Sequence, residues 1–337
     1  MSRPSIPADC LPPVPAEESA VRSADGTRLH VEVHGQPGAP TVVLAHGWTC
    51  STAFWAPVIH QLADRYRVVA YDQRGHGRSE VPPSRVRYST RALGEDLAAV
   101  LTRVVPPGER AVLAGHSMGG MTIMAGAARA EVAERTAAAV LVSTGPFDLV
   151  RELNVVPRAV HSGLRLLLHR ELMRSRLPLG PVNPLTRAGL GYAIMGTSAT
   201  AARTEVAVRM VHACPTAVRA NWARVLGRLD VRAGLARLAV PTSVVVGAED
   251  RLTPPVHAHR IVEALADPQG LLLLPGVGHM APIERPAEVA AEIHRMATAH
   301  LPGTRAADAT AAAPAAADAT TGTDATTGTD PERTAVA

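Results

Sequence analysis

Three residues of types that cooperate in nucleophilic catalysis each follow a stretch with strand character. Ser117 stands between Gly115 and Gly119 in the run "VLAGHSMGGM", Asp250 ends "VVVGAED", and His279 ends "LLLLPGVGH". A serine hydroxyl is a weak nucleophile until a neighbouring base accepts its proton and a third group orients that base. Serine, carboxylate and histidine in this order along the chain therefore predict acyl-transfer chemistry.

The two glycines that flank Ser117 have a steric explanation. Where a strand turns sharply into a helix at a serine, the strained backbone leaves room only for neighbours without side chains. The run "RAVLAG" before Ser117 is apolar like a buried strand, and "MGGMTIMAGAARA" after it is rich in helix-forming residues. Chance alone gives Gly-x-Ser-x-Gly in about one chain in ten of this length. The flanking strand and helix therefore carry the prediction of a nucleophile elbow.

The elements expected around these residues alternate between strand and helix. "AVRSADGTRLHVEVHG" predicts a hairpin that turns at Asp25 and Gly26, and "TVVLAHG", "YRVVAYDQRG" and "AAAVLVST" are apolar runs typical of buried parallel strands. The pattern predicts an α/β fold with a mostly parallel, doubly wound sheet. Because consecutive parallel strands end at one edge of the sheet, Ser117, Asp250 and His279 should meet there.

The order of the predicted strands and helices divides the chain into five expected segments. After Thr144 the strand pattern stops, and only helical stripes follow until "PTSVVVGAED". A helical insertion between two strands of one sheet is interpreted as a cap, and the final stretch, with its repeat "DATTGTDATTGTD", has too little apolar surface to fold. The expected segments are a flexible arm (1–18), the core's first part (19–144), a cap or lid (145–238), the core's second part (239–302) and a disordered tail (303–337).

Charge and composition exclude several other classes of protein. All 34 lysine or arginine positions are arginine. Residues 151–237 contain 14 of these arginines and only four acidic residues. No nucleic-acid-binding module accompanies this bias, so no nucleic-acid partner is expected. Transient contact of the basic cap with an anionic or lipid surface is compatible with the charge, but a solvated arginine-rich face is the interpretation that the pattern favours.

Cofactors and special compartments are not indicated by the sequence. Cys10, Cys50 and Cys214 are odd in number and widely spaced, which predicts neither a disulfide framework nor a metal site, and no cofactor is expected. No apolar run reaches transmembrane length, and the proline-rich start does not resemble a signal peptide, so a cytoplasmic location is expected.

Five segments together resemble the α/β-hydrolase superfamily, of the serine-nucleophile type with a helical cap. They are "HGW" (46–48), "YDQRGHGRS" (71–79), "GHSMGG" (115–120), "GAEDRLTP" (247–254) and "GVGHMAPIERP" (276–286). The resemblance covers residues 19–302.

The resemblance implies a role for each candidate residue. Ser117 would be the nucleophile, His279 the general base and acid, and Asp250 the orienting carboxylate. The backbone N–H groups of Trp48 and Met118 would form the oxyanion hole. Asp148, in "GPFDL", is an alternative acid, because some relatives carry theirs after that strand.

Hydrolysis of a carboxylic ester, lactone or thioester of a small to medium apolar molecule is the expected reaction. Relatives that open epoxides or displace halide generally use aspartate as nucleophile, so Ser117 argues against both reactions. The same triad is also found in carbon–carbon bond hydrolases and in cofactor-free perhydrolases of the haloperoxidase type. A non-catalytic protein of this fold that binds a small ligand is the alternative from another class. The oligomeric state is left open.

Overall fold

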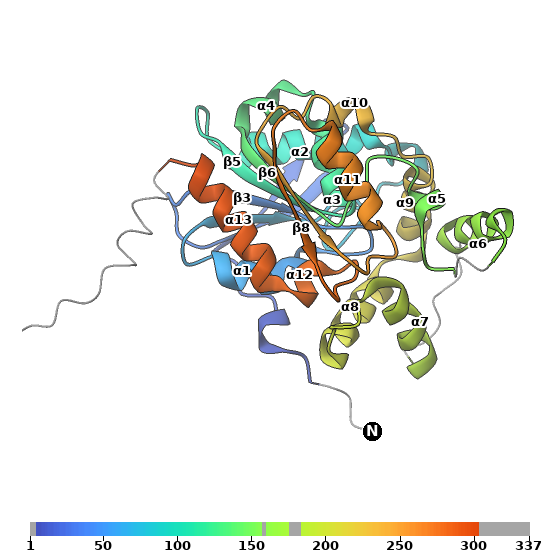
Figure 1. Ribbon diagram of the computed structural model, residues 1–337. Helices are drawn as coiled ribbons and strands as arrows, with labels where there is room; N and C mark the ends of the chain where they lie inside the picture. Colours follow the sequence, from blue (N-terminus) through green and yellow to red (C-terminus); the bar gives the residue numbers. More distant parts are fainter. Residues whose placement is uncertain (1–4, 157–159, 175–182, 303–337) are drawn as a thin grey trace, which may run out of the picture.

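A mostly parallel eight-stranded sheet forms the centre of the part of the chain that the structure describes, residues 5–156, 160–174 and 183–302 (Figure 1). The structure is a computed structural model. The strands are β1 (Glu17–Arg22), β2 (Arg28–His34), β3 (Thr41–Ala45), β4 (Arg67–Tyr71), β5 (Ala111–His116), β6 (Thr136–Val142), β7 (Thr242–Gly247) and β8 (Pro268–Leu274). Their order across the sheet is β1-β2-β4-β3-β5-β6-β7-β8. β2 pairs antiparallel with β1 and β4, and the other pairings are parallel.

Helices cover both faces of this sheet (Figure 1). One face carries α2 (Thr90–Val104), α3 (Met118–Gly126), α4 (Ala130–Arg135), α10 (Arg232–Leu235) and α11 (Pro255–Ala264). The other carries α1 (Ala56–Leu62), α12 (Ala281–Glu284) and α13 (Pro286–His300). Short 3₁₀ helices are η1 (Ala8–Cys10), η2 (Thr52–Trp55) and η3 (Arg85–Arg87).

The sheet residues alternate between two hydrophobic cores, one on each face. Val43 and Leu113 belong to the core beneath α2 and α3, whereas Val42 and Val112 belong to the core beneath α1 and α13. A strand with both faces covered buries every residue, which explains the continuous apolar runs in the sequence. The predicted mostly parallel α/β fold is confirmed.

The predicted hairpin at the start of the sheet is also present. β1 and β2 pair in register on either side of Asp25 and Gly26. Gly26 has a φ of +84°, a conformation that glycine adopts without strain, and the Asp25 carboxylate accepts the Thr27 N–H at 3.1 Å.

Between β6 and β7 the chain forms a group of helices at the carboxyl ends of the strands (Figure 1). These are α5 (Leu149–Glu152), α6 (Ser162–Arg174), α7 (Pro184–Ile194), α8 (Ala201–Ala213) and α9 (Thr216–Leu226). Trp48 Nε1 donates to the carbonyl oxygen of Arg219 at 3.2 Å, and Trp222 Nε1 donates to that of Arg74 at 3.2 Å. The inserted helices are thereby joined to the loops that follow β3 and β4.

The amino-terminal arm differs from what the sequence suggested, and the carboxyl-terminal tail lies outside the described residues. Part of the arm expected over residues 1–18 is packed against the core: Cys10 is buried, Asp9 forms an ion pair with Arg203 at 2.6 Å, and β1 already begins at Glu17. The tail expected over residues 303–337 lies outside the described residues. Among the described helices, none is long and apolar enough to cross a membrane.

Candidate active site

Ser117 stands at the junction of β5 and α3 with a strained backbone. Its φ is +51° and its ψ is −115°, a region that residues with a side chain rarely adopt. The Ser117 N–H donates to the Val142 carbonyl at 2.9 Å, and the Ser117 carbonyl accepts from Met121 N at 3.1 Å and from Thr144 Oγ1 at 2.7 Å. These bonds to β6 and α3 hold the turn in place.

The glycines around Ser117 make this turn sterically feasible. A Cβ at Gly115 would lie 2.6 Å from the backbone of Gly119, and a Cβ at Gly119 would lie 2.0 Å from the Ala45 carbonyl oxygen. Both distances are far below van der Waals contact. The Gly-x-Ser-x-Gly pattern is therefore required because α3 runs directly beside β5 and β3.

Asp250 and His279 are brought together from the ends of β7 and β8. His279 Nδ1 lies 2.9 Å from Asp250 Oδ2 and 3.1 Å from Oδ1. Because a carboxylate only accepts, Nδ1 carries the hydrogen and Nε2 is left able to accept a proton. The carboxylate is itself fixed by the N–H groups of Leu252 and Thr253, both at 2.8 Å, and by Thr253 Oγ1 at 2.9 Å.

His116, the residue before Ser117, links the elbow to His279. Its Nε2 donates to the His279 carbonyl at 2.8 Å, and the two ring centroids are 4.9 Å apart. Burial lowers the pKa of His116 well below its ordinary value, so the ring is neutral. Because His116 is next to Ser117 in the chain, its contact with His279 places Ser117 and His279 at the same edge of the sheet.

The loop after β3 borders Ser117 from the other side. A Cβ at Gly47 would lie 3.1 Å from the Ser117 Cβ. Within the described part of the chain, the backbone N–H groups of Trp48 and Met118 have no acceptor. An oxyanion formed on a carbonyl carbon requires free N–H donors of this kind, so these two groups are the candidates for that role.

Two buried histidines hold this loop. His46 Nε2 accepts the Gln73 N–H at 3.0 Å while its Nδ1 donates to the Gly47 carbonyl at 2.7 Å. His76 Nε2 accepts the N–H of Thr49, which has a φ of +65°. Burial lowers the pKa of His46 to about 4 and that of His76 to about 3, so both rings stay neutral acceptors. The strained backbone next to Trp48 is thus fixed by neutral side chains.

Comparison with known proteins shows which family the chain belongs to. The family model described as alpha/beta hydrolase fold matches residues 40–286. The chain belongs to the α/β-hydrolase family. It is 31% identical over 242 residues to a non-heme chloroperoxidase from Streptomyces lividans, covering 69% of this chain and 83% of the relative.

Two further comparisons define the extent of the similarity. Over 299 residues the chain is 27% identical to the probable oxidoreductase EphD of Mycobacterium tuberculosis, covering 82% of this chain and 49% of that protein. The chain thus spans about half the length of the first curated relatives it matches. A thermophilic esterase from Thermogutta terrifontis has the same fold, with a TM-score of 0.66, 24% identity and coverage of 83% of this chain and 97% of that one.

Glu284 is a residue of this α/β-hydrolase site that the sequence analysis missed. Its buried carboxylate accepts the N–H groups of Gly278 at 3.0 Å and Met280 at 3.2 Å, on both sides of His279, and that of Gly196 at 2.8 Å. Burial raises the pKa of Glu284. An acidic residue within the otherwise apolar run "MAPIE" is the signal that could have indicated a buried carboxylate with backbone partners.

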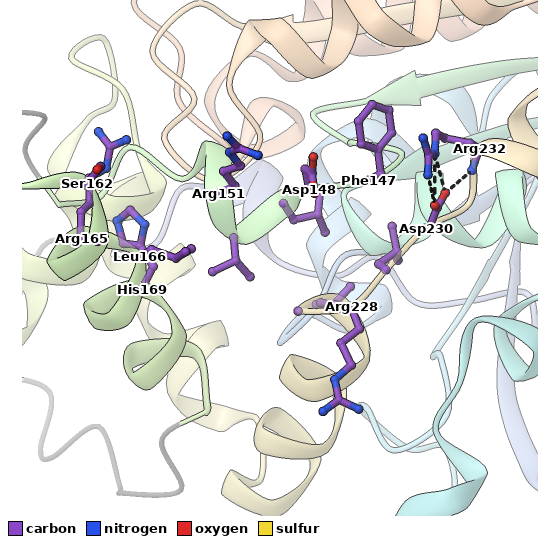
Figure 2. A pocket seen from close by; sticks show the side chains of 16 residues that line it. Phe147, Asp148, Arg151, Ser162, Arg165, Leu166, His169, Arg228, Asp230 and Arg232 are labelled. Atoms are coloured by element: carbon purple, nitrogen blue, oxygen red, sulfur yellow. Dashed lines mark hydrogen bonds and ion pairs between the residues drawn. The ribbon is translucent and has the colours of Figure 1, made fainter.

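Asp148, the alternative acid, lies apart from His279. It is exposed at the first turn of α5 with a φ of +55°, and no hydrogen bond joins it to His279 in the described part of the chain. Instead it lines a cavity beside α5 and α6 (Figure 2). The geometry therefore favours Asp250 as the partner of the histidine.

Metal and thiol chemistry have no evident site in the described residues. No group of three or more His, Cys, Asp or Glu side chains there is arranged to hold a metal ion. Cys10, Cys50 and Cys214 are buried and free, and burial raises the pKa of each thiol.

Proposed function

We propose that the chain is a serine hydrolase that cleaves carboxylic esters of small to medium apolar molecules through an acyl-enzyme. The observation that carries this proposal is the pairing of both Asp250 oxygens with His279 Nδ1 beside a serine held at a strained elbow. That pairing fixes the tautomer in which His279 Nε2 can accept the serine proton.

The residues would act in sequence. Ser117 Oγ attacks the ester carbonyl carbon while His279 Nε2 takes its proton, and Asp250 stabilises the imidazolium that forms. The oxyanion receives hydrogen bonds from the N–H groups of Trp48 and Met118. His279 then donates the proton to the departing alcohol. A water molecule, activated by His279, releases the acid and restores Ser117.

A second candidate uses hydrogen peroxide instead of water in the last step. The specific support is the similarity to the Streptomyces lividans protein named non-heme chloroperoxidase. Attack of peroxide on the acyl-enzyme gives a peracid and leaves the first half of the mechanism unchanged. The two candidates are distinguished by letting water and hydrogen peroxide compete for one acyl-enzyme. The ratio of peracid to carboxylic acid is measured at equal turnover of ester.

The proposal is tested by intact-mass analysis after treatment with a fluorophosphonate. We expect one phosphonyl adduct on the wild-type chain and on the control Ser162→Ala, whose serine is exposed on α6, and none on Ser117→Ala. A panel of 4-nitrophenyl esters then measures turnover. An adduct that persists in folded Ser117→Ala, or wild-type protein that neither reacts nor turns over esters, would contradict the proposed function.

A further inference from the structure

A cavity of about 790 Å³ lies among the inserted helices (Figure 2). Its walls come from the segment at α5, from α6, and from the residues that connect α9 to α10. This volume falls within the range of about 300–1,000 Å³ that is usual for small-molecule sites. The cavity is distinct from the residues proposed for catalysis, none of which line it.

The wall of the cavity has an apolar part. Leu149 and Val150 of α5 contribute to it, together with Leu226 and Leu229 from the other side; all four are buried. Leu166 of α6 lies among the residues that close it. A hydrocarbon body would therefore find apolar contact there.

The rim of the cavity is basic. Arg151, Arg165 and Arg228 line it, and none of their side chains has an ion pair or hydrogen bond in the part of the chain that the structure describes. Figure 2 shows that their guanidinium groups lie apart from one another rather than gathered at one point. Arg232 is neutralised by Asp230 at 2.5 Å, and Asp148 adds one exposed carboxylate. The ionised lining therefore retains an excess of positive charge.

His169 adds a polar atom that is buried in the same wall. The side chain is 1% exposed, and its Nε2 accepts the Val156 N–H at 3.1 Å, which places the hydrogen on Nδ1. Nδ1 has no well-formed hydrogen bond in the described residues, although the Val150 carbonyl interacts with the ring. Buried donors are normally satisfied, so a ligand acceptor in the cavity would complete this one.

We propose that this cavity binds the anionic part of an amphiphilic small molecule, a carboxylate or phosphate attached to an aliphatic or aromatic body. The apolar wall receives the body, and the unpaired arginines and His169 Nδ1 receive the oxygens. Arginine guanidinium groups suit both kinds of oxyanion.

The position of the cavity assigns this ligand to the substrate, an assignment that rests on the proposed function. Thr144 Oγ1 donates to the Ser117 carbonyl, and Asp148 in the cavity wall is four residues further along the chain. Four residues span at most about 14 Å, so Asp148 lies within that distance of Thr144, a separation that a substrate of moderate length can span. An ester with an apolar body and a remote acid group is the substrate class that fits.

Binding is tested by calorimetry on the full chain carrying Ser117→Ala. The probes are 4-phenylbutyrate, phenyl phosphate, inorganic phosphate and the neutral 4-phenylbutyramide. We expect at least one of the two aromatic anions to bind well above the amide and inorganic phosphate, and the stronger of them identifies the acid group. Arg165→Gln and Arg228→Gln should each weaken that binding roughly tenfold. The matched control is Arg224→Gln, an exposed α9 residue outside the cavity, which should leave binding unchanged.

Equal weakening by all three substitutions, or equal affinity for the acid and the amide, would overturn the anion site. A lipid surface is the competing occupant, because Leu164, Leu167 and Leu168 of α6 are exposed. Binding to phosphatidylglycerol vesicles without calorimetric binding of either aromatic anion would favour that occupant and overturn the proposal.

The link to catalysis is tested with a pair of esters, 4-nitrophenyl hemiglutarate and 4-nitrophenyl butyrate. We expect wild-type kcat/KM to favour the acidic ester, and Arg165→Gln and Arg228→Gln to reduce this preference through KM. Selective anion binding without turnover of either ester would overturn the proposed hydrolase but keep the anion site. Turnover without a preference that depends on these arginines would overturn the assignment to substrate.

Discussion

Polar side chains at the strand ends are buried and hydrogen bonded, whereas many in the inserted helices are exposed and unpaired. His76 and Asp250 are at most 3% exposed and have partners on neighbouring loops. Arg151 and Arg228 are exposed, with no side-chain partner in the described residues. Groups that must meet a transition state gain from being fixed in advance. Groups that receive different ligands can stay adaptable. The strand-end loops therefore suit the proposed catalysis, and the inserted helices suit the proposed selection of substrate.

The largest expected difference between the regions concerns the two candidate acids. Asp250→Asn should lower kcat about 10⁴-fold, because an amide neither stabilises the imidazolium nor keeps the required tautomer of His279. Asp148→Asn should change kcat less than about threefold, because Asp148 is exposed and belongs to the inserted helices. Steady-state hydrolysis of one 4-nitrophenyl ester measures both variants.

The thermal unfolding of each variant is the control, because Asp250 also holds the backbone of Leu252 and Thr253. A folded Asp250→Asn enzyme with near-normal kcat, or a greater loss in Asp148→Asn, would move the orienting role to the inserted segment and remove the contrast between the two regions.

The sequence allowed prediction of the features that follow from local pattern and strand order. Ser117, Asp250 and His279 each follow a strand, and parallel strands end at one edge, so their place at a common edge could be predicted without knowledge of side-chain contacts. The hairpin at Gly26 could be predicted for the same reason, since its signal lies within the turn itself.

Contacts between distant loops could not be predicted in this way. Glu284 binds the backbone of Gly196, and Asp9 binds Arg203, 194 residues away; neither partner is marked by spacing or periodicity. The arm was expected to be flexible for this reason, because only the folded chain brings Asp9 to α8. The cavity of the inserted helices is likewise a product of packing between α5, α6 and the segment after α9.

Two glycine substitutions, one in each region, should have opposite effects on the free energy of unfolding. Gly119→Ala should lower the free energy of unfolding by about 3 kcal/mol or more, because its Cβ would lie 2.0 Å from the Ala45 carbonyl and backbone would have to move. Gly189→Ala, on exposed α7 with open space around its Cβ, should raise it by about 0.5–1 kcal/mol.

Urea unfolding of both variants, followed by circular dichroism, gives these values. Equal effects at the two positions would mean that the elbow can relax, and the steric account of the Gly-x-Ser-x-Gly pattern would be wrong. A destabilised Gly189→Ala would instead show that α7 is packed more tightly than its surface position indicates.

Acid sensitivity should also belong to the strand-end loops. Burial holds the folded-state pKa of His46 at about 4 and that of His76 at about 3, below the ordinary value of about 6.5 in the unfolded chain. The unfolded chain therefore binds more protons below pH 6.5, and stability falls as pH decreases from there towards pH 4 and pH 3 respectively. At pH 5 each histidine should account for a loss of about 2 kcal/mol.

The measurement is urea unfolding at pH 7, 6 and 5 for the wild type, His76→Gln and His161→Gln. His76→Gln removes one buried histidine, so its loss of stability between pH 7 and 5 should be smaller than that of the wild type by about 2 kcal/mol. His161 is exposed in the inserted segment, and its substitution should leave the loss unchanged. Parallel pH profiles for all three proteins would show that His76 is protonated at little cost, and the strand-end loops would then not be held by neutral imidazoles.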